Sequence, residues 1–323
     1  MLTDDSIDIY LTMKQFDVLV AGEINPDLIL MGDVVPEFGQ VEKLVDSAEL
    51  TIGSSSVIFA CGAARLGLKV GFIGVVGDDL FGQFMLKSMQ QLKIDISNVI
   101  VDQEQSTGFS VILNRGTDRA ILTFIGTIDA LSPHQLTDEL LSQTLHLHIA
   151  SYFLQKKLRP GIMDIFKRAR IQGISTSLDV NWDPAGKWAG VQKVLEVTNV
   201  FFPNDREGKS LTGKKTPEHV VENLTSSVET VAMKMGANGA IARRGNQVYR
   251  VPALKVDVVD TVGAGDTFDA GFIYGYLQGW SLNRSLELAV VCGSLSTQAT
   301  GGTIGQPTLK EALKAIRKLD ETI

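Results

Sequence analysis

Short apolar runs alternate with longer helical patterns along most of the chain, and this order constrains the fold more than any other feature. The runs are rich in Val, Ile, Leu and Phe without regular polar alternation, which indicates strands buried on both faces. This order predicts an α/β fold, in which helices cover both faces of a mainly parallel sheet. The expected strands span residues 16–22, 69–74, 145–149, 175–180, 200–202, 230–235 and 240–243, and the expected helices span residues 54–66, 82–92, 160–172 and 220–224.

Two segments, residues 33–50 and 106–127, depart from this order. They contain short strands in which polar and apolar residues alternate, and Asn114-Arg115-Gly116 predicts a hairpin turn in the second segment. Half-polar strands of this kind predict a small sheet outside the main core, which we interpret as a lid or a dimerisation surface. The expected organisation is a domain over residues 16–323, with the lid inserted in it, and an N-terminal extension over residues 1–15.

Composition and charge exclude several classes of protein. Thirty Lys and Arg against 37 Asp and Glu give a net charge of −7, which lacks the basic footprint of a nucleic-acid-binding protein. The two cysteines, Cys61 and Cys292, lie in apolar runs and are typical of buried thiols in a reducing compartment. The acidic first ten residues do not resemble a signal peptide, and basic residues and glycines interrupt the most apolar stretch, residues 57–76. We therefore expect a cytoplasmic protein without nucleic-acid or membrane partners.

The strongest local motif is a glycine-rich turn that leads into a predicted helix, within residues 260–272. Gly263, Ala264 and Gly265 precede Asp266 at the start of this helix. The first N–H groups of a helix lack partners and the helix dipole adds positive potential, so such a turn can bind an anion. Asp266 could simply cap the helix. A capping Asp needs no small residues before it, however, whereas a phosphate that approaches the backbone closely does.

The segment Asp-Thr-x-Gly-Ala-Gly-Asp-Thr-Phe-x-Ala-Gly resembles the C-terminal signature of the ribokinase-like, or PfkB, family of carbohydrate kinases. The resemblance extends from about residue 16 to the C-terminus. It implies a Rossmann-like three-layer α/β/α core with a β lid, and ATP and Mg²⁺ as cofactors. It also implies that Asp266 is the base that takes a proton from the substrate hydroxyl, and that the amides of Gly263, Ala264 and Gly265 form an anion hole, with Gly265 beside the nucleotide. Such roles suit phosphoryl transfer, which depends mainly on positioning and charge neutralisation.

Residues 22–27, Gly-Glu-Ile-Asn-Pro-Asp, follow the first predicted strand. The family uses an Asn-x-Asp here to hold sugar hydroxyls, so the resemblance implies that Asn25 and Asp27 bind substrate. Taken alone, Asn-Pro-Asp is a turn formula.

Residues 53–67 fall where the family has its N-terminal signature, and the closing Ala-Arg-Leu-Gly matches. The resemblance implies that Gly53 and Ser54 bind substrate, although Ser54 could equally cap the following helix. Two residues depart from the pattern, since Ser54 replaces a second glycine and Ile58 replaces an asparagine that usually contacts the sugar.

Two motifs are implied to bind nucleotide and metal. Asn204 and Glu207 match the Asn-x-x-Glu that organises magnesium and phosphate waters in the family, and without that context they would predict a helix N-terminus. Lys234, Gly236 and Gly239 match a nucleotide-contacting turn, for which the alternative is an ordinary hairpin turn.

Two further segments resemble family motifs. Residues 299–302 resemble a loop beside the adenine and, in some members, a monovalent cation such as K⁺. In Asp179-Val-Asn-Trp-Asp183, the last residue replaces a family arginine. This change predicts a weaker contact with the phosphates, unless Lys187 or another basic residue compensates.

Three other motifs are assigned no catalytic role. His146 and His148 lie on one face of a predicted strand without a third ligand at suitable spacing, which favours a structural role. Residues 208–215 nearly form a P-loop, but Lys215 stands where a Ser or Thr must contact magnesium. Phe268 occupies the third glycine position of a dinucleotide fingerprint, which argues against an NAD-dependent oxidoreductase.

We therefore predict an ATP-dependent kinase that phosphorylates a hydroxyl of an unphosphorylated sugar, sugar acid or nucleoside. A sugar-phosphate kinase is less favoured, because a phosphorylated acceptor needs cations near Gly53 and the following serines supply none. The alternative is a catalytically weak or inactive sugar- or nucleotide-binding sensor, which the departures at Ile58 and Asp183 favour. We also expect a homodimer through the lid, because an exposed sheet edge invites pairing.

Overall fold

The computed structural model describes residues 14–115 and 118–320. The N-terminal extension expected over residues 1–15 thus lies almost entirely outside the described residues. The main sheet has eight strands in the order β14-β13-β12-β11-β10-β9-β1-β4. Its strands are β1 (Phe16–Ala21), β4 (Val70–Ile73), β9 (Thr144–Ile149), β10 (Ser175–Leu178), β11 (Val200–Phe201), β12 (Thr230–Lys234), β13 (Ala240–Arg244) and β14 (Gln247–Val251).

Strands β4, β1 and β9 to β12 pair in parallel, whereas β13 and β14 are antiparallel. The predicted mainly parallel sheet is therefore confirmed. The helices are α1 (Ser55–Leu66), α2 (Leu80–Gln91), α3 (Asp138–Leu141), α4 (Ile162–Ile171), α5 (Val191–Leu195), α6 (Asp205–Thr212), α7 (Pro217–Leu224), α8 (Ala264–Leu277), α9 (Leu282–Ser296) and α10 (Leu309–Asp320), with short 3₁₀ helices at Gly126–Asp129, Pro133–Gln135, Arg159–Gly161 and Gly236–Asn238.

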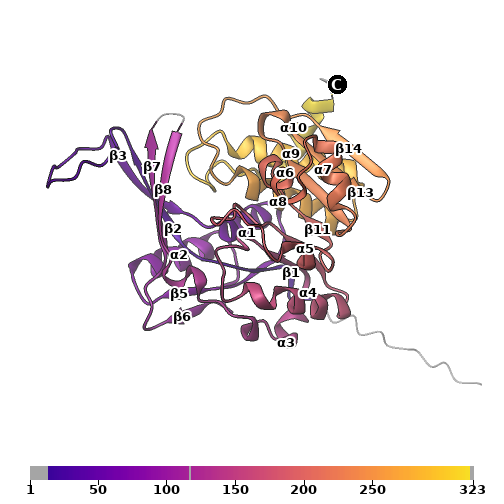
Figure 1. The fold of residues 1–323 in the computed structure, drawn as a ribbon, viewed down its shortest axis with the longest axis horizontal. Helices are drawn as coiled ribbons and strands as arrows, with labels where there is room; N and C mark the ends of the chain where they lie inside the picture. The colour runs from indigo at the N-terminus through magenta and orange to yellow at the C-terminus, as the bar shows by residue number, and fades with distance from the viewer. Residues whose placement is uncertain (1–13, 116–117, 321–323) are drawn as a thin grey trace, which may run out of the picture.

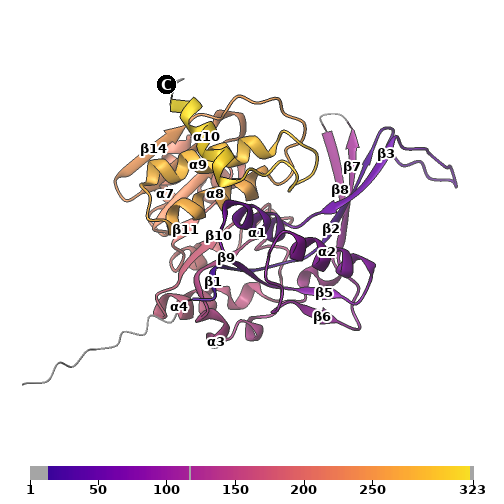
Figure 2. The ribbon, with the colours of Figure 1, turned by 180° about the vertical axis from the view of Figure 1, so that it is seen from behind.

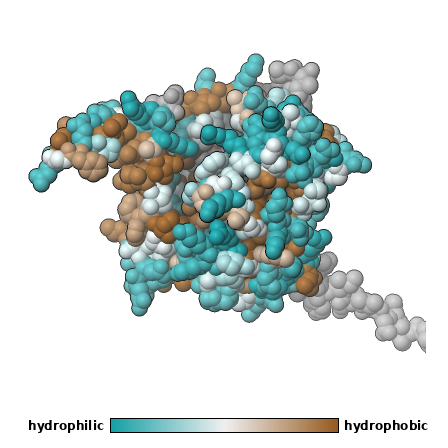
Figure 3. All heavy atoms as spheres, in the orientation of Figure 1, coloured by the Kyte–Doolittle hydropathy of each residue, from teal (hydrophilic) through white to brown (hydrophobic). Residues whose placement is uncertain are grey.

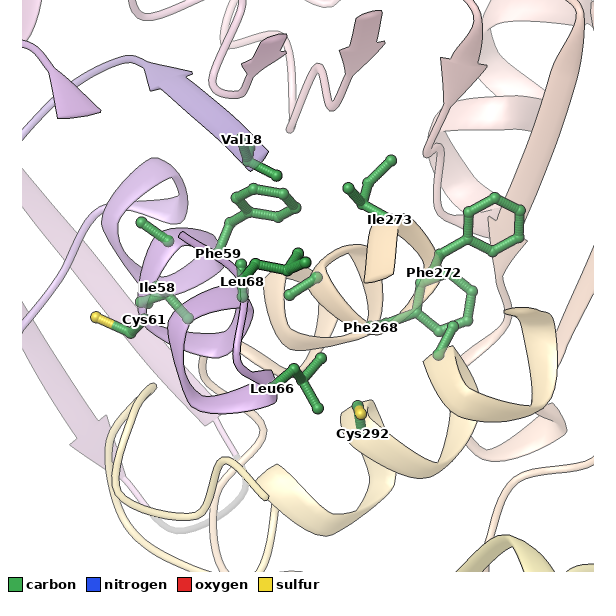
Figure 4. Close-up of a cluster of buried hydrophobic side chains, with 14 of the residues drawn as sticks. Val18, Ile58, Phe59, Cys61, Leu66, Leu68, Phe268, Phe272, Ile273 and Cys292 are labelled. Carbon is green, nitrogen blue, oxygen red and sulfur yellow. The ribbon is translucent and has the colours of Figure 1, made fainter. Parts of the chain in front are cut away.

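Two hydrophobic cores, one on each face of the sheet, make the fold a three-layer structure. Along β1, Val18 and Val20 pack with α1, α2 and α8 to α10, whereas Leu19 and Ala21 pack on the opposite side with α3 to α7. Side chains alternate between faces along a strand, so one continuous apolar run serves both cores. Figure 4 shows part of the first core, where Val18 and Phe59 face side chains of α8.

The lid is a second sheet, of four strands in the order β3-β2-β7-β8. It rises on one side of α1, and the C-terminal helices stand on the other side (Figures 1 and 2). Its strands are β2 (Pro26–Met31), β3 (Ser47–Ile52), β7 (Phe109–Arg115) and β8 (Asp118–Phe124), and a separate small sheet pairs β5 (Val75–Gly77) with β6 (Ile100–Asp102).

The lid differs from the sequence prediction in two respects. Strand β2 belongs to it and pairs in parallel with β7, although the predicted lid segments, residues 33–50 and 106–127, did not include it. This strand begins at Pro26, so the turn that Asn-Pro-Asp indicates when taken alone does not form. Proline is compatible with the first residue of a strand, because a backbone N–H is not needed there. Residues 33–46 form a loop, and pairing with β2 begins only at Ser47.

The carboxyl ends of the parallel strands meet at one edge of the main sheet, where ligands bind in open α/β folds. Polar residues follow these ends, including Glu23 after β1, Ser151 after β9 and Asp179 after β10. The first turns of α1 and α8 reach the same edge. Ser55 in α1 accepts a hydrogen bond from Asn181, which follows β10, and Asp266 in α8 lies near the charge of Asp179.

Cys61 on α1 and Cys292 on α9 are buried free thiols within the first core (Figure 4), as the sequence predicts. Across residues 14–115 and 118–320, we find no helix whose length and apolar content would let it cross a membrane.

Candidate active site

The turn before α8 requires glycine at residue 263. Gly263 adopts φ 69°, in the left-handed region, and a Cβ there would lie 2.8 Å from both Gly302 Cα and Ile58 Cγ2. A larger residue would therefore push the turn away from the loop at Gly302 and from α1. The N–H of Ala264 donates to Thr261 O at 3.3 Å, and the N–H groups of the first helical turn lack intrahelical acceptors.

Asp266 lies in the first turn of α8 and is only 9% exposed. Burial raises its pKa to about 8, and the charges of Asp179 and Glu23 add to this rise. The charge of Lys234 and, to a smaller extent, the Ser55 side chain act in the opposite direction. A general base works best when its pKa is near the operating pH, so this environment suits Asp266 to proton transfer.

A buried ion cluster surrounds this carboxylate. One oxygen from each of Asp179, Asp266 and Asp269 lies within 4.8 Å of the others. Lys234 Nζ donates to Asp179 Oδ2 at 2.6 Å and to both oxygens of Asp269 at 3.1 Å. Burial alone would raise the pKa of Asp179, but the Lys234 ammonium holds it below its usual range, whereas burial keeps the pKa of Asp269 well above its usual range. The Lys234 ammonium lies closer to Asp179 than to Asp269.

The sequence motif predicts that Lys234 contacts a nucleotide. In the structure its ammonium bonds Asp179 and Asp269. Sequence reasoning also missed Asp269 as part of the cluster. Its only local signal was its position three residues after Asp266, which places both side chains on one side of α8.

Asn204 and Glu207 meet across the first turn of α6. Asn204 Oδ1 accepts from Glu207 N at 3.0 Å, and Glu207 Oε2 accepts from Asn204 N at 2.8 Å. This is a capping box, so the helix-start interpretation of the motif also holds. Burial, with the nearby charge of Asp179, raises the pKa of Glu207 to about 7. Pro203 O accepts from Lys234 N at 2.9 Å, which brings this pair beside the ion cluster.

This edge of the sheet fits a divalent cation. Four buried carboxyl groups, those of Asp179, Glu207, Asp266 and Asp269, surround the single ammonium of Lys234. Burial raises the pKa values of Glu207, Asp266 and Asp269, and the negative charge of Asp179 adds to the rise of each; a bound cation would relieve this repulsion. Carboxylate and amide oxygens are donors that Mg²⁺ accepts.

The nearby turn at residues 235–239 depends on two glycines with positive φ, Gly236 at 56° and Gly239 at 78°. A Cβ on Gly239 would overlap the carbonyl oxygen of Val251. Across the site, the loop at residues 299–302 is held against the turn before α8, because Gly301 N donates to Asp260 Oδ2 at 2.9 Å.

The predicted acceptor residues Asn25, Asp27 and Gly53 lie together. Gly53 N donates to Asn25 O at 3.1 Å, and a Cβ on Gly53 would overlap Asp27 Oδ1. Burial raises the pKa of Asp27 to about 7, although the charge of Arg119 on the lid acts against this rise. The structure thus brings a buried carboxylate from the lid sheet to the N-terminus of α1.

Ser54 and Ile58 make internal contacts. The Ser54 hydroxyl donates to Glu23 O at 2.7 Å and accepts from Val57 N at 3.1 Å, so it caps α1. The buried Ile58 packs against Gly263 and Gly302. Both departures from the family's N-terminal signature therefore help to join α1 to its neighbours.

Asp183, the residue in the family's arginine position, is buried and organises its own loop. Its carboxylate accepts from the backbone N–H groups of Ala185, Lys187 and Trp188 at 2.7 to 2.9 Å. Although burial opposes it, these hydrogen bonds hold the pKa of Asp183 below its usual range. Where the family has an arginine, this chain therefore has a carboxylate that holds its own loop in place.

The two histidines are buried in the main sheet and bonded to serines. His146 contacts Ser175 and Ser177 at 2.7 Å, and His148 contacts Ser177 at 2.8 Å. Burial lowers the pKa of His146 to about 3, so the ring is neutral, in agreement with a structural role.

A buried carboxyl of raised pKa, next to a helix N-terminus that can bind an anion, is the kind of site that supports phosphoryl transfer. Residues 15–309 match the family described as pfkB family carbohydrate kinase. The 2-dehydro-3-deoxygluconokinase of Bacillus subtilis is 29% identical over 301 residues, which cover 89% of this chain and 92% of that protein. The ATP-dependent ribose-1-phosphate kinase of Halopiger xanaduensis is 30% identical over 286 residues, which cover 88% and 93%.

A solved structure of an Escherichia coli protein assigned as ribokinase II, in complex with ATP and Mg²⁺, has the same fold. Its TM-score is 0.81 at 24% identity, and the match covers 94% of this chain and 99% of that one. The chain belongs to the PfkB family of carbohydrate kinases, enzymes that transfer a phosphoryl group to an alcohol. The resemblance read from the glycine-rich motif is confirmed.

Proposed function

We propose that this protein is an ATP-dependent kinase that phosphorylates a hydroxyl of an unphosphorylated sugar, sugar acid or nucleoside, with Asp266 as the general base. The observation that carries the proposal is the buried Asp266 carboxyl, whose pKa is raised to about 8 at the N-terminus of α8. The family match and the ATP complex of the structural neighbour support ATP as the phosphoryl donor.

The proposed reaction uses residues from both sides of the edge. Asn25, Asp27 and Gly53 hold the acceptor, and Asp266 takes the proton of its hydroxyl while the oxygen attacks the γ-phosphate. The bond between the γ-phosphorus and the bridging oxygen of ADP breaks, and ADP leaves. The amides of Gly263, Ala264 and Gly265 face the transferred group, where fixed N–H donors stabilise developing negative charge. The lid closes over the acceptor and excludes water, which would otherwise compete with it for the phosphoryl group.

Asn204 and Glu207 are the residues that would hold Mg²⁺, through water. A bound Mg²⁺ would neutralise charge on the phosphates, and the excess of buried carboxylates described above supports a cation at this edge. Gly236, Gly239 and Lys234 would lie on the nucleotide side. A monovalent cation such as K⁺ beside residues 299–302 is part of the same proposal.

The acceptor side supports an unphosphorylated substrate. Ser54 and Ser56, which follow Gly53, carry no charge and direct their hydroxyls to Glu23. Arg119 on β8 is a lid cation whose charge reaches Asp27. One cation is enough for a sugar acid, and the name of the Bacillus subtilis relative denotes a sugar-acid kinase. The name of the Halopiger xanaduensis relative denotes a sugar-phosphate kinase. Sugar phosphates, although less favoured, are therefore included among the acceptors to be tested.

We also propose a homodimer through the lid. Apolar side chains gather over the lid sheet in Figure 3, and those of Ile121, Leu122 and Phe124 on β8 are 50 to 60% exposed. A strand with such residues at a sheet edge favours pairing with a second copy.

The test of the function is ADP release from MgATP with a panel of sugars, sugar acids, sugar phosphates, polyols and nucleosides. An acceptor that gives turnover, lost in Asp266→Asn, supports the proposal and names the acceptor class. Turnover that survives in Asp266→Asn would overturn the role of Asp266. Silence across the panel, together with thermal stabilisation by ATP or a sugar, would favour the sensor.

A further inference from the structure

A cavity of about 810 Å³ lies among the end of α1, residues 254–257, residues 298–307 and α10. None of the acceptor, base or Mg²⁺ residues proposed above lines it. Its volume falls within the range of small-molecule sites in proteins. The cavity is therefore large enough for a ligand that is separate from ATP and from the acceptor.

Cations outnumber carboxylates on the walls of this cavity. The charged residues that line it are Arg65, Lys255 and Lys314 against Asp257 and Glu311. Glu311 already caps α10, because its Oε2 accepts from Thr308 N at 2.8 Å and from Thr308 Oγ1 at 2.7 Å. The remaining charge favours an anionic ligand.

The guanidinium of Arg65 enters the cavity without a protein partner. Its Nε is buried and has no hydrogen-bond acceptor. The ion pairs formed within residues 14–115 and 118–320 do not include Arg65 either. A partly buried guanidinium binds carboxylate or phosphate oxygens strongly, since its N–H groups match their geometry.

Gln306 supplies a second unsatisfied group on the same cavity and is 1% exposed. Its Nε2 donates to Ile58 O at 2.8 Å and to Thr267 Oγ1 at 3.0 Å. The Ile58 carbonyl can only accept, so the amide nitrogen must face it and the orientation of the amide is fixed. Gln306 Oε1 is then left buried without a donor. A hydroxyl or N–H group of a ligand would satisfy it.

We propose that this cavity is a second ligand site, which takes a small organic anion bearing a hydroxyl group. Arg65 binds the carboxylate or phosphate of this ligand, with Lys255 and Lys314 at hand to neutralise further charge, and Gln306 Oε1 accepts from its hydroxyl. The site goes beyond the proposed kinase reaction and does not depend on it.

The walls of the cavity lead directly into the turn before α8. Residues 254–257 continue into the segment that ends at Gly263, and residues 298–299 continue to Gly301. These segments are already joined, because Val259 N donates to Thr297 O at 2.8 Å and Gly301 N donates to Asp260 Oδ2 at 2.9 Å. A ligand that contacts both walls favours this arrangement and so braces the turn at Gly263.

The test uses the full protein saturated with Mg²⁺ and a non-hydrolysable ATP analogue, so that the nucleotide site is filled. Inorganic phosphate, malate and 3-phosphoglycerate are titrated by calorimetry at constant ionic strength. We expect malate or 3-phosphoglycerate to bind more tightly than inorganic phosphate, because only these probes carry a hydroxyl for Gln306 as well as an anionic group for Arg65. Absence of binding by all three at about 10 mM, which fills a site of millimolar Kd, would overturn the proposal.

Three variants locate the bound probe. We expect Arg65→Gln to raise its Kd by about 10-fold or more. Lys314→Gln, on an exposed part of α10, raises the Kd by about 2- to 5-fold and guards against a folding defect in the first variant. Lys310→Gln removes the same charge from the same helix outside the cavity, and the Kd stays within about 2-fold. A Kd that is equal in the unmodified protein, Arg65→Gln and Lys314→Gln would overturn the site.

Amide hydrogen exchange gives a second readout. The bound probe should slow exchange in residues 254–263 and 304–315. Protection confined to residues 22–55 or 235–239 would place the anion at the acceptor or the nucleotide and overturn the site, and unchanged exchange in residues 258–263 would overturn the bracing of the turn. Neither measurement requires turnover, so failure of this site is distinguishable from failure of the proposed function.

Discussion

The ammonium of Lys234 lies 2.6 Å from Asp179 Oδ2, at the edge where the strands β10 and β12 end, and the two side chains are 13% and 3% exposed. An ion pair of this kind contributes little net stability, because the loss of hydration of both groups offsets their attraction. Removing one partner is costly, since the other charge is then left buried alone. Lys234 therefore fixes the geometry of the carboxylates around Asp266.

The first prediction follows from this pair. Lys234→Met leaves Asp179 and Asp269 without their cation, and we expect the free energy of unfolding at pH 7 to fall by about 3–5 kcal/mol. Lys209→Met is the control, because Lys209 pairs with Asp205 at 2.7 Å on a partly exposed face of α6, where loss of an ion pair costs about 0.5 kcal/mol or less. Urea denaturation measures both, and equal losses would contradict the assignment.

The second prediction concerns pH. Burial raises the pKa of Asp266 from its ordinary value of 3.8 to about 8 in the folded protein. Its contribution to stability is therefore present in full at low pH and is lost as the pH rises from about 4 to 8, because the folded state binds the proton more tightly. The raised pKa values of Asp27 and Glu207, each about 7, act in the same direction.

Asp266→Asn cannot ionise, so we expect it to melt about 2–6 °C above the unmodified protein at pH 8, with the difference vanishing towards pH 4. The exposed Asp257→Asn serves as the control and should show no such dependence. Thermal melts over this range decide the matter. An Asp266→Asn variant that is less stable at pH 8 would contradict the sign.

The third prediction tests the acceptor side. Gly53→Ala places a methyl group onto the Asp27 carboxylate. We expect the acceptor KM to rise by about 10-fold or more, because a displacement of about 1 Å at a binding group is enough to misplace a substrate. The KM for ATP is the internal control and should remain within about 2-fold, since we propose that ATP binds on the other side of Asp266. Equal changes in both KM values would argue for general misfolding.

The fourth prediction tests the lid. Leu122→Glu introduces a charge on the exposed apolar surface of β8, and we expect it to convert a dimer into monomers at micromolar concentration. The matched control is Val248→Glu. Val248 is 42% exposed and lies on β14, an edge strand of the main sheet outside the lid. Light scattering after size-exclusion chromatography measures the mass. A protein that is monomeric before substitution would reject the proposed dimer.

Much of the site was predictable because its residues are close in sequence. The turn before Asp266 is set by Gly263, and the Asn204–Glu207 capping box needs only three residues of spacing. The strands of the main sheet were predictable for a similar reason. A continuous apolar run indicates a strand buried on both faces, whichever strands it pairs with.

Two contacts could not be predicted from the sequence, one between distant segments and one within an irregular loop. Pro26 reads locally as part of a turn, but pairing of β2 with β7, about 80 residues later, makes it the start of a lid strand. Asp183 reads as a missing cation, and only the fold of its loop reveals three N–H groups converging on its carboxylate.

The sequence by itself determined the layered α/β core, the family and the helix-terminal position of Asp266, because each depends on local pattern or spacing. Only the tertiary structure decided what surrounds that carboxyl. Lys234, Asp179 and Glu23 reach it from separate strand ends, and Ser55 reaches it from another helix. Burial and the convergence of charges set its pKa, and both arise only when distant segments pack together.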